Sequence, residues 1–267
     1  MLITVNISGG KEINSQEFNK SSQIRAAGFG MLYLVATPIG NLDDISKRAL
    51  DALGQADVIA CEDTRRTRIL LAHFGLKVPH IFMSYREGNE EHTGERILDL
   101  LAQGKNVALC TDSGFPGVSD PGYRLSALAA EKGVEFTVLP GASAVHVALL
   151  LSGLPTSSYT FKGYPPKKEG AARSFFLEEK DMSHTLVLFE SPYRVGKSLK
   201  VAFDVLGDRR VAVCAELTKK FERVYRGYLG ELASRFENEA IKGEVTIVIA
   251  GNNPKFSRVA KSAAVSL

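Results

Sequence analysis

Short apolar runs alternate with longer amphipathic segments from Met31 onward, and this alternation restricts the fold more than any other feature of the sequence. Residues 31–36, 57–62 and 106–110 form short, mainly apolar runs, as expected for strands buried within a sheet. Between them lie segments with apolar residues at helical spacing, such as 90–101. Strands that alternate with helices in this way predict an α/β fold built of packed layers.

Glycine, proline and serine indicate where the chain divides. The stretch at 153–159 reads "GLPTSSY" and follows a predicted helix, so we expect a linker there. A division at this point gives an N-terminal unit over 31–153 and a C-terminal unit over 154–251. Within the second unit, 221–229 alternates in polarity, which is typical of an antiparallel strand. Residues 252–267 are polar and are expected to form a poorly ordered tail.

The composition is that of an ordinary globular enzyme, with 45% hydrophobic and 24% charged residues. A net charge of +3 permits a polyanionic partner without requiring one. No run approaches about 18 consecutive apolar residues, so no membrane-spanning helix is predicted. Cys61, Cys110 and Cys214 lie in or beside apolar runs and lack the spacing of metal ligands. We therefore expect buried, reduced thiols in a cytoplasmic protein.

The first thirty residues have none of the features of a secretory signal. They lack a basic region followed by an apolar core. We expect them to form a flexible polar leader, and Met31 is a candidate for an alternative translation start.

Three loops rich in glycine and proline follow predicted strands. They are "ATPIGN" (36–41), "DSGFPGVSDPG" (112–122) and "LPGASA" (139–144). In an open α/β sheet the ends of the strands are where ligands bind, and glycine lets a ligand approach the backbone closely. Asp112 can accept hydrogen bonds there, whereas Asp120 is expected to shape the turn into the next helix. One such loop is more often a turn, but three at one edge predict a shared ligand cleft.

Several familiar signatures are absent from the sequence. It contains no GxGxxG after the first strand, no GxxxxGK[ST], no HExxH and no GxSxG. These absences argue against a standard dinucleotide site, a P-loop, a zinc protease and a hydrolase elbow. The five histidines are scattered, so no metal site is predicted.

Basic residues cluster in three places, at 64–68, 164–173 and 218–226. Each could be no more than a solvated surface. The arginines of the first cluster lie at the start of a predicted helix, where positive charge opposes the helix dipole unless an anion offsets it. The second cluster, with "YPPKK", joins an aromatic ring to two cations, a combination suited to single-stranded RNA.

The segments "YLVATPIGNLDDIS", "ACEDTRRT", "DSGFPGVSDPGYRL", "LPGASA", "GLPTSSYTFKGYPPKK", "FESPYRV", "ELTKKFE" and "KGEVTIVI" occur in a characteristic order. Together they resemble the ribosomal RNA 2′-O-ribose methyltransferases of the tetrapyrrole-methylase superfamily, from about Met31 to Gly251. The resemblance implies two αβα domains, with S-adenosylmethionine bound in the cleft between them. It also implies methylation of a decoding-region cytidine (cytidine 1402) of 16S rRNA, free or in the small ribosomal subunit, by a homodimer. No membrane partner is expected.

The resemblance also assigns roles to residues of this sequence. The implied cofactor-binding residues are Pro38, Ile39, Gly40, Asp112, Gly114, Val118, Ser143, Ala144, Leu217 and Glu244. The implied RNA-binding residues are Arg65, Arg66, Lys167 and Lys168. Phe115 and Tyr193 depart from the common pattern, in which threonine and histidine are usual.

A ribose hydroxyl is a weak acid, so its methylation is helped by a base or by a cation that stabilises the emerging alkoxide. Asp63, Glu190 and Lys219 are the catalytic candidates, because each lies at the end of a predicted strand near the cleft. Asp63 has an alternative role, which is to cap the helix that begins "TRRT".

Two other functions stay open on the sequence alone. One is methylation of a porphyrin or corrin precursor by a member of the same superfamily. The other is a non-catalytic RNA-binding relative that has lost the cofactor.

Overall fold

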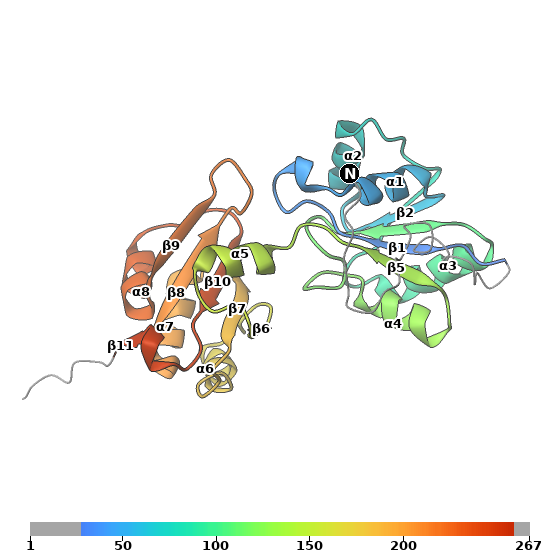
Figure 1. Ribbon diagram of the computed structural model, residues 1–267. Coiled ribbons are helices and arrows are strands. Elements are labelled where there is room, and N and C mark those ends of the chain that lie inside the picture. Colours follow the sequence, from blue (N-terminus) through green and yellow to red (C-terminus); the bar gives the residue numbers. More distant parts are fainter. Residues whose placement is uncertain (1–27, 259–267) are drawn as a thin grey trace, which may run out of the picture.

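The computed structural model describes residues 28–258, which form two α/β units, each built around one sheet (Figure 1). The first sheet has five parallel strands in the order β3-β2-β4-β1-β5. These strands are β1 (Leu32–Val35), β2 (Val58–Cys61), β3 (Ile81–Ser84), β4 (Val107–Cys110) and β5 (Phe136–Leu139). Because β4, β1 and β5 are parallel neighbours, the three glycine-rich loops that follow them meet at one edge. The sequence-based placement of these loops is thereby confirmed.

Helices cover both faces of the first sheet (Figure 1). The helices are α1 (Lys47–Gln55), α2 (Thr64–His73), α3 (Glu90–Ala102) and α4 (Tyr123–Glu131), with a short 3-10 helix, η2 (Leu42–Asp44). Leu53 and Leu71 from α1 and α2 pack in a cluster with Ile59 of the sheet. Ile97 and Leu125 from α3 and α4 pack in a second cluster on the opposite face. This unit is an αβα sandwich.

The second sheet is mixed, with the order β11-β8-β10-β7-β6 and β9 paired with β8. Only β6 and β7 are parallel; the other pairs are antiparallel. The strands are β6 (Tyr159–Phe161), β7 (Thr185–Glu190), β8 (Asp208–Ala215), β9 (Arg223–Tyr228), β10 (Val245–Ile249) and β11 (Ser257–Arg258). The predicted antiparallel strand at 221–229 is confirmed as β9.

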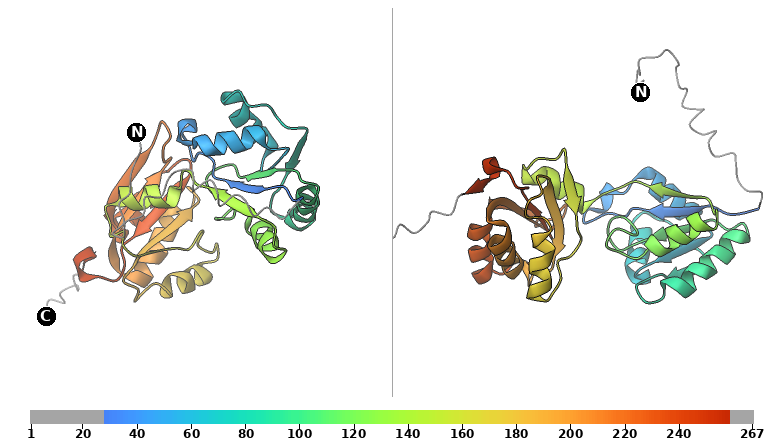
Figure 2. Two further views of the ribbon diagram at one scale, coloured as in Figure 1. Left: turned by 45° about the vertical axis from the view of Figure 1, so that its right-hand side comes forward. Right: turned by 90° about the horizontal axis from the view of Figure 1, so that it is seen from below.

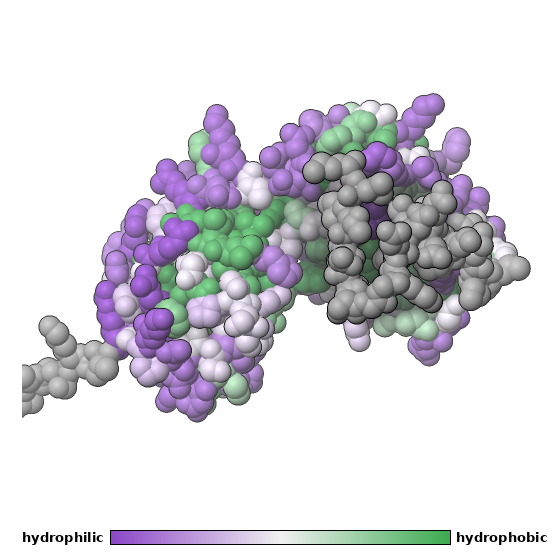
Figure 3. Space-filling view, in the orientation of Figure 1, coloured by the Kyte–Doolittle hydropathy of each residue, from purple (hydrophilic) through white to green (hydrophobic). Residues whose placement is uncertain are grey.

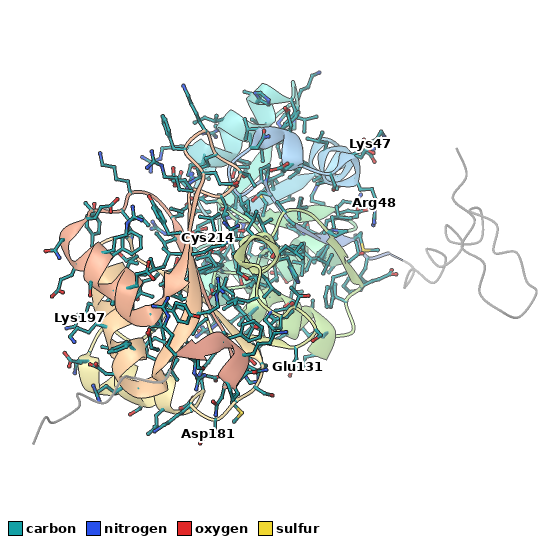
Figure 4. All side chains as sticks on the ribbon, turned by 60° about the vertical axis from the view of Figure 1, so that its left-hand side comes forward. Lys47, Arg48, Glu131, Asp181, Lys197 and Cys214 are labelled. Carbon is teal, nitrogen blue, oxygen red and sulfur yellow. The ribbon has the colours of Figure 1, made fainter. Side chains whose placement is uncertain are left out.

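One face of the second sheet is covered by three helices, α6 (Glu169–Leu177), α7 (Val195–Leu206) and α8 (Leu229–Asn238). The other face is covered by α5 (Ala144–Ser152), whose Val145, Ala148 and Leu149 pack with Val187 and Ala212 of the sheet. The second unit is therefore also an αβα sandwich. Charged side chains such as Lys47, Arg48 and Lys197 lie on the outside of the helices (Figure 4).

The packing of α5 changes where the chain divides. This helix was assigned to the N-terminal unit (31–153), but it belongs to the second sheet, so the crossing between units lies at 140–143 (Figure 2). The stretch 153–159 is a turn within the second unit. Gly153 ends α5 in the left-handed conformation, with φ of 70°. The structure therefore favours a division at 140–143 in place of the predicted linker.

The two ends of the described chain differ from expectation. Of the predicted leader, residues 1–27 lie outside the described residues, whereas the Gly30 amide donates to the Leu101 carbonyl at 2.8 Å. Of the predicted poorly ordered tail, 259–267 lie outside them. The rest of the tail is ordered: η3 (Pro254–Phe256) leads into β11, which pairs with β8. The Arg258 guanidinium lies 3.5 Å from the centre of the Tyr228 ring. Tertiary contacts thus fix a segment that its polar composition does not.

The three cysteines are buried and free, as predicted. Burial raises the pKa of the Cys61 thiol to about 11. Across residues 28–258, no helix combines the length and the apolar character needed to cross a membrane.

Candidate functional site

Two connected cavities lie between the units, at the edge where the strands of the first sheet end. The larger cavity, of about 320 Å³, lies between the loop after β4, the start of α5, the end of β7 and the start of β10. The smaller, of about 240 Å³, lies between the loop after β1, α2 and the loop after β8. Ile39, Ser113 and Glu244 line both cavities, so the two form one cleft.

The loop after β1 lies directly against the second unit. An added Cβ on Gly40 would lie 2.7 Å from the Leu217 carbonyl oxygen, so only glycine allows this approach. The Asn41 amide donates to the Thr218 hydroxyl at 3.0 Å. On the other side of this contact, Glu216 and Thr218 have positive φ values of 53° and 63°, an uncommon conformation for residues other than glycine. Strained backbone therefore lies where the two units meet.

The loop after β4 is folded tightly on itself. The Gly117 amide donates to the Pro121 carbonyl at 3.1 Å, and a Cβ on Gly122 would lie 2.8 Å from the Gly117 nitrogen. Gly122 has a φ of 140°, and Ser119 is left-handed with a φ of 63°. Pro121 and Gly122 shape the turn into α4, as expected. Asp120, however, lines the larger cavity.

Asp112 ties this loop to the segment "EDTRRT". Its carboxylate accepts hydrogen bonds from the Asp63 amide at 3.2 Å and from Arg66 at 3.1 Å. Its own amide donates to the Glu62 carboxylate at 3.3 Å. Burial is the main cause that raises the pKa of Glu62, and the nearby negative charge of Asp112 also raises it. The sequence motif is thus a network of hydrogen bonds at the base of the cleft.

The cleft concentrates negative charge. Burial raises the pKa of Asp120 to about 7, and the nearby carboxylates of Glu62, Asp112 and Glu244 add to the effect. One buried hydroxyl in the smaller cavity, that of Thr111, has no hydrogen-bond partner among residues 28–258. Buried polar groups are seldom left without a partner. Both features suit a cationic ligand that also offers hydrogen-bonding groups.

Asp63 lies outside both cavities. Its carboxylate accepts the Arg65 amide at 2.8 Å as the N-cap of α2 and pairs with the Arg65 guanidinium at 2.7 Å. The hydrogen bonds from Arg65 lower the pKa of Asp63 to about 2. A carboxylate with so low a pKa is a weak base, so the structure favours the capping role.

Glu190 lines the larger cavity, but its oxygens are engaged elsewhere. The Ser191 amide donates to one oxygen at 2.7 Å. Ser198 donates a hydrogen bond to the other, and Arg194 lies 3.3 Å from it. Arg194 in turn donates to the Pro165 carbonyl at 2.8 Å. Glu190 therefore organises the loop after β7 and the loop before α6.

Lys219 lines the smaller cavity, between two carboxylates. Its ammonium lies 2.8 Å from Glu216 and 2.9 Å from Glu244. Burial alone would lower the pKa of Lys219, but the hydrogen bonds to the two glutamates outweigh it and raise the pKa. Lys219 is therefore a fixed cation at the cleft rather than a base.

The cleft brings together most of the residues that the family resemblance assigned to cofactor binding. Leu217 is the exception, because its side chain is buried with α5 and the second sheet. The residues that line the cavities are Pro38, Ile39, Gly40, Asp112, Gly114, Val118, Ser143, Ala144 and Glu244. Sequence reasoning missed Asp120, Tyr164 and Phe189, which also line the larger cavity. Two signals were present: Asp120 lies in a loop that was predicted to line the cleft, and Tyr164 lies beside the "PPKK" cations.

The predicted RNA-binding residues lie around the cleft in two groups. Arg66 lines the smaller cavity, and Arg65 lies beside it at the start of α2. Lys167 and Lys168 are exposed in the segment that leads from Tyr164 to α6. Tyr193 is 96% exposed, next to Pro192 of the larger cavity.

Comparison with known proteins finds relatives that match most of the chain. Ribosomal RNA small subunit methyltransferase I of Halalkalibacterium halodurans is 43% identical over 226 residues, which cover 85% of this chain and 78% of that protein. The protein of the same name from Thermotoga maritima is 40% identical and is matched over 83% of this chain and 99% of its own.

Solved structures share the fold at lower identity. Uroporphyrin-III-C-methyltransferase from Thermus thermophilus has a TM-score of 0.59 and 21% identity, covering 82% of this chain and 94% of that one. Diphthine synthase has a TM-score of 0.62 and 20% identity, covering 83% and 90%. Residues 31–233 match the family described as tetrapyrrole (corrin/porphyrin) methylases. The chain belongs to this family of methyltransferases.

Proposed function

We propose that the protein transfers a methyl group from S-adenosylmethionine to the ribose 2′-hydroxyl of the decoding-region cytidine of 16S rRNA. The observation that carries this proposal is the identity of 40–43%, over more than four fifths of the chain, to relatives named for methylation of small-subunit ribosomal RNA. The cleft supports it, because it offers separate places for a cationic donor and for a polyanion.

The two cavities, which we call the inner cleft, suit the methyl donor. When bound, S-adenosylmethionine supplies an electrophilic methyl group on a positively charged sulfur. Gly114, Ser143 and Ala144 present backbone and small side chains to the larger cavity, and Glu244 supplies negative charge there. The unpartnered Thr111 hydroxyl in the smaller cavity offers a further hydrogen bond. These residues can hold the donor and exclude water from it.

The exposed surface around the two cavities, which we call the outer cleft, suits RNA. The cations Arg65, Arg66, Lys167 and Lys168 lie at its edges, as phosphate contacts require. Tyr164 and Tyr193 are 57% and 96% exposed, so their rings are free to stack on unpaired bases. Lys219 lies at the boundary of the two regions, where its positive charge can stabilise developing negative charge on the ribose oxygen.

We further propose that the protein is a cytoplasmic homodimer. An apolar area covers the part of the second unit around α5 (Figure 3), and Leu150 of this helix is 72% exposed. Such areas commonly mark contacts between proteins. Light scattering coupled to size-exclusion chromatography would measure the mass, and Leu150→Glu is expected to shift it from two chains to one.

The test of the function is methyl transfer to small ribosomal subunits. Subunits and deproteinised 16S rRNA from a strain lacking this gene would be incubated with the protein and labelled S-adenosylmethionine. We expect incorporation of label, and reverse transcription at low nucleotide concentration should stop at one decoding-region cytidine. Comparison of the two substrates identifies which of them the protein accepts.

The methyl-transfer assay and a binding measurement examine the two alternatives left open by the sequence. Transfer to uroporphyrinogen without transfer to RNA would instead indicate a tetrapyrrole substrate. Calorimetry that detects no binding of S-adenosylmethionine would indicate a non-catalytic RNA-binding protein.

A further inference from the structure

Asp120 differs from the other carboxylates of the cleft in having no partner. Among residues 28–258, no group donates a hydrogen bond to its side chain and no cation lies within 4 Å of it. Asp112 and Glu244 are paired with Arg66 and Lys219. Glu190 accepts hydrogen bonds from Ser191 and Ser198 and is paired with Arg194. Asp120 alone lines the larger cavity with an uncommitted carboxylate.

The loop holds this carboxylate toward the cavity rather than toward the helix that follows. An aspartate just before a helix usually caps it. Here Gly122 is the N-cap of α4 and no side chain caps the helix, so the Asp120 carboxylate is not used as a cap. The Gly122 amide donates to Glu90 at 3.2 Å. The left-handed Ser119 turns the chain immediately before Asp120, and its hydroxyl lies against Gly163 of the second unit. The strained turn at Ser119 therefore helps to hold the Asp120 carboxylate toward the cavity.

The groups that face Asp120 come from both units and are mostly acidic. They are Glu62 and Asp112 from the loops after β2 and β4, Glu244 beside β10, and Tyr164 from the segment before α6. The nearby cations are already engaged, Arg66 by Asp112 and Lys219 by Glu216 and Glu244. Burial and repulsion raise the pKa of Asp120 to about 7, so this carboxylate can both lose and accept a proton near neutral pH.

We propose that Asp120 is the group that accepts the proton of the ribose 2′-hydroxyl. This inference rests on the proposed function. The ribose oxygen forms a bond to the methyl carbon while the carbon–sulfur bond breaks and its electron pair remains on sulfur. The hydroxyl proton passes to the Asp120 carboxylate, which afterwards releases it to water. Asp120 thereby takes the role for which Asp63, Glu190 and Lys219 were candidates, since none of those three offers a free base.

The kinetic test compares wild type with Asp120→Asn, Asp120→Glu and the control Asp99→Asn. Asp99 is exposed on α3 and lines neither cavity. Single-turnover methylation would be measured with saturating S-adenosylmethionine across the pH range of about 5.5 to 8.5. We expect the wild-type rate to rise with pH below the midpoint. Asp120→Asn should be slower by about 10²–10⁴-fold and nearly independent of pH, and Asp120→Glu should recover part of the rate.

Two further measurements do not depend on turnover. The ¹³C chemical shift of the Asp120 carboxyl carbon, assigned by its loss in Asp120→Asn, should titrate with a midpoint near pH 7 in the unliganded protein. The affinity of Asp120→Asn for S-adenosylmethionine, measured by calorimetry, should stay within about threefold to tenfold of wild type, the loss of a hydrogen bond at most. Circular dichroism would establish that the variants are folded.

Three results would overturn the inference. The first is an Asp120→Asn rate within about threefold of wild type, with the same pH profile. The second is weak donor binding by Asp120→Asn with a full rate at saturation, which would make Asp120 a donor-binding residue. The third is a wild-type protein that methylates neither subunits nor rRNA. Only the third also overturns the proposed function, so the two failures are distinguishable.

Discussion

The two walls of the cleft are built in different ways. The first unit contributes loops whose backbone shape depends on glycine and proline, and these loops form what we call the backbone wall of the cavities. The second unit contributes side chains held by hydrogen bonds and ion pairs, such as Glu190 and Lys219. We therefore expect the backbone wall to be disturbed by a substitution that adds a Cβ atom. The side-chain wall should be disturbed by a substitution that removes a hydrogen-bond or ion-pair partner.

The largest expected effect is on the backbone wall. In Gly122→Ala the new Cβ would lie 2.8 Å from the Gly117 nitrogen, a backbone atom that can move away only if the loop changes its shape. We expect a loss of about 3 kcal/mol or more in the free energy of unfolding, measured in urea. The matched control is Gly133→Ala, where φ is also positive but no atom lies within 4 Å; about 1 kcal/mol is expected there. Equal losses would mean that contact within the loop is unimportant.

The next effect is on the side-chain wall. Glu190→Gln keeps the size of the side chain but removes the charge that faces Arg194 and replaces one of the two oxygens that accept from Ser191 and Ser198 with an NH2 group. Arg194 then has no counter-charge, and one hydrogen-bond donor of this site has no acceptor. We therefore expect a loss of about 2–3 kcal/mol in the free energy of unfolding. Glu237→Gln, at an exposed position on α8, should change stability by less than about 0.5 kcal/mol. A small effect of Glu190→Gln would show that the second wall does not depend on this network.

Asp120 is a side chain carried by a loop of the backbone wall. Unlike the two substitutions above, its replacement is expected to raise the free energy of unfolding. Its pKa is raised to about 7 in the folded protein, so the folded state binds this proton more tightly than the unfolded state does. Stability is therefore lost as pH rises from about 4 to about 7. Asp120→Asn, which stays neutral, should raise the free energy of unfolding by about 1–2 kcal/mol at pH 8, after allowance for solvent screening, and by little at pH 4. Stabilisation that did not depend on pH would contradict the assigned cause.

The same contrast explains how much could be predicted from the sequence. Backbone walls depend on glycine and proline, which are visible in the sequence, and the loops 36–41, 112–122 and 139–144 were placed correctly. Side-chain walls depend on which partner each group finds. Glu190 and Lys219 were predicted as catalytic because nothing in the sequence showed that Ser198, Arg194, Glu216 and Glu244 would surround them.

Two further misses have related causes. Helix α5 is apolar on nearly every side, so its sequence gave no sign of which sheet it would cover. Asp120 was interpreted as a turn residue, because the pattern Asp-Pro-Gly commonly forms turns. The carboxylate lies in the cavity without a partner because of tertiary contacts around the loop. The chief ones are the hydrogen bond from Gly122 to Glu90 and the contact of Ser119 with Gly163.

The smallest effect concerns the cations at the rim. Arg65 is already paired with Asp63, whereas no anionic side chain of residues 28–258 lies within 4 Å of the Lys167 ammonium. Lys167→Ala should therefore weaken binding to small ribosomal subunits more than Arg65→Ala does, and should lower the slope of log K against log salt concentration by about 0.7–0.9. Filter binding at several salt concentrations measures both quantities. Equal slopes for the two variants would mean that RNA displaces Asp63 from Arg65, and that the two walls contact the phosphates alike.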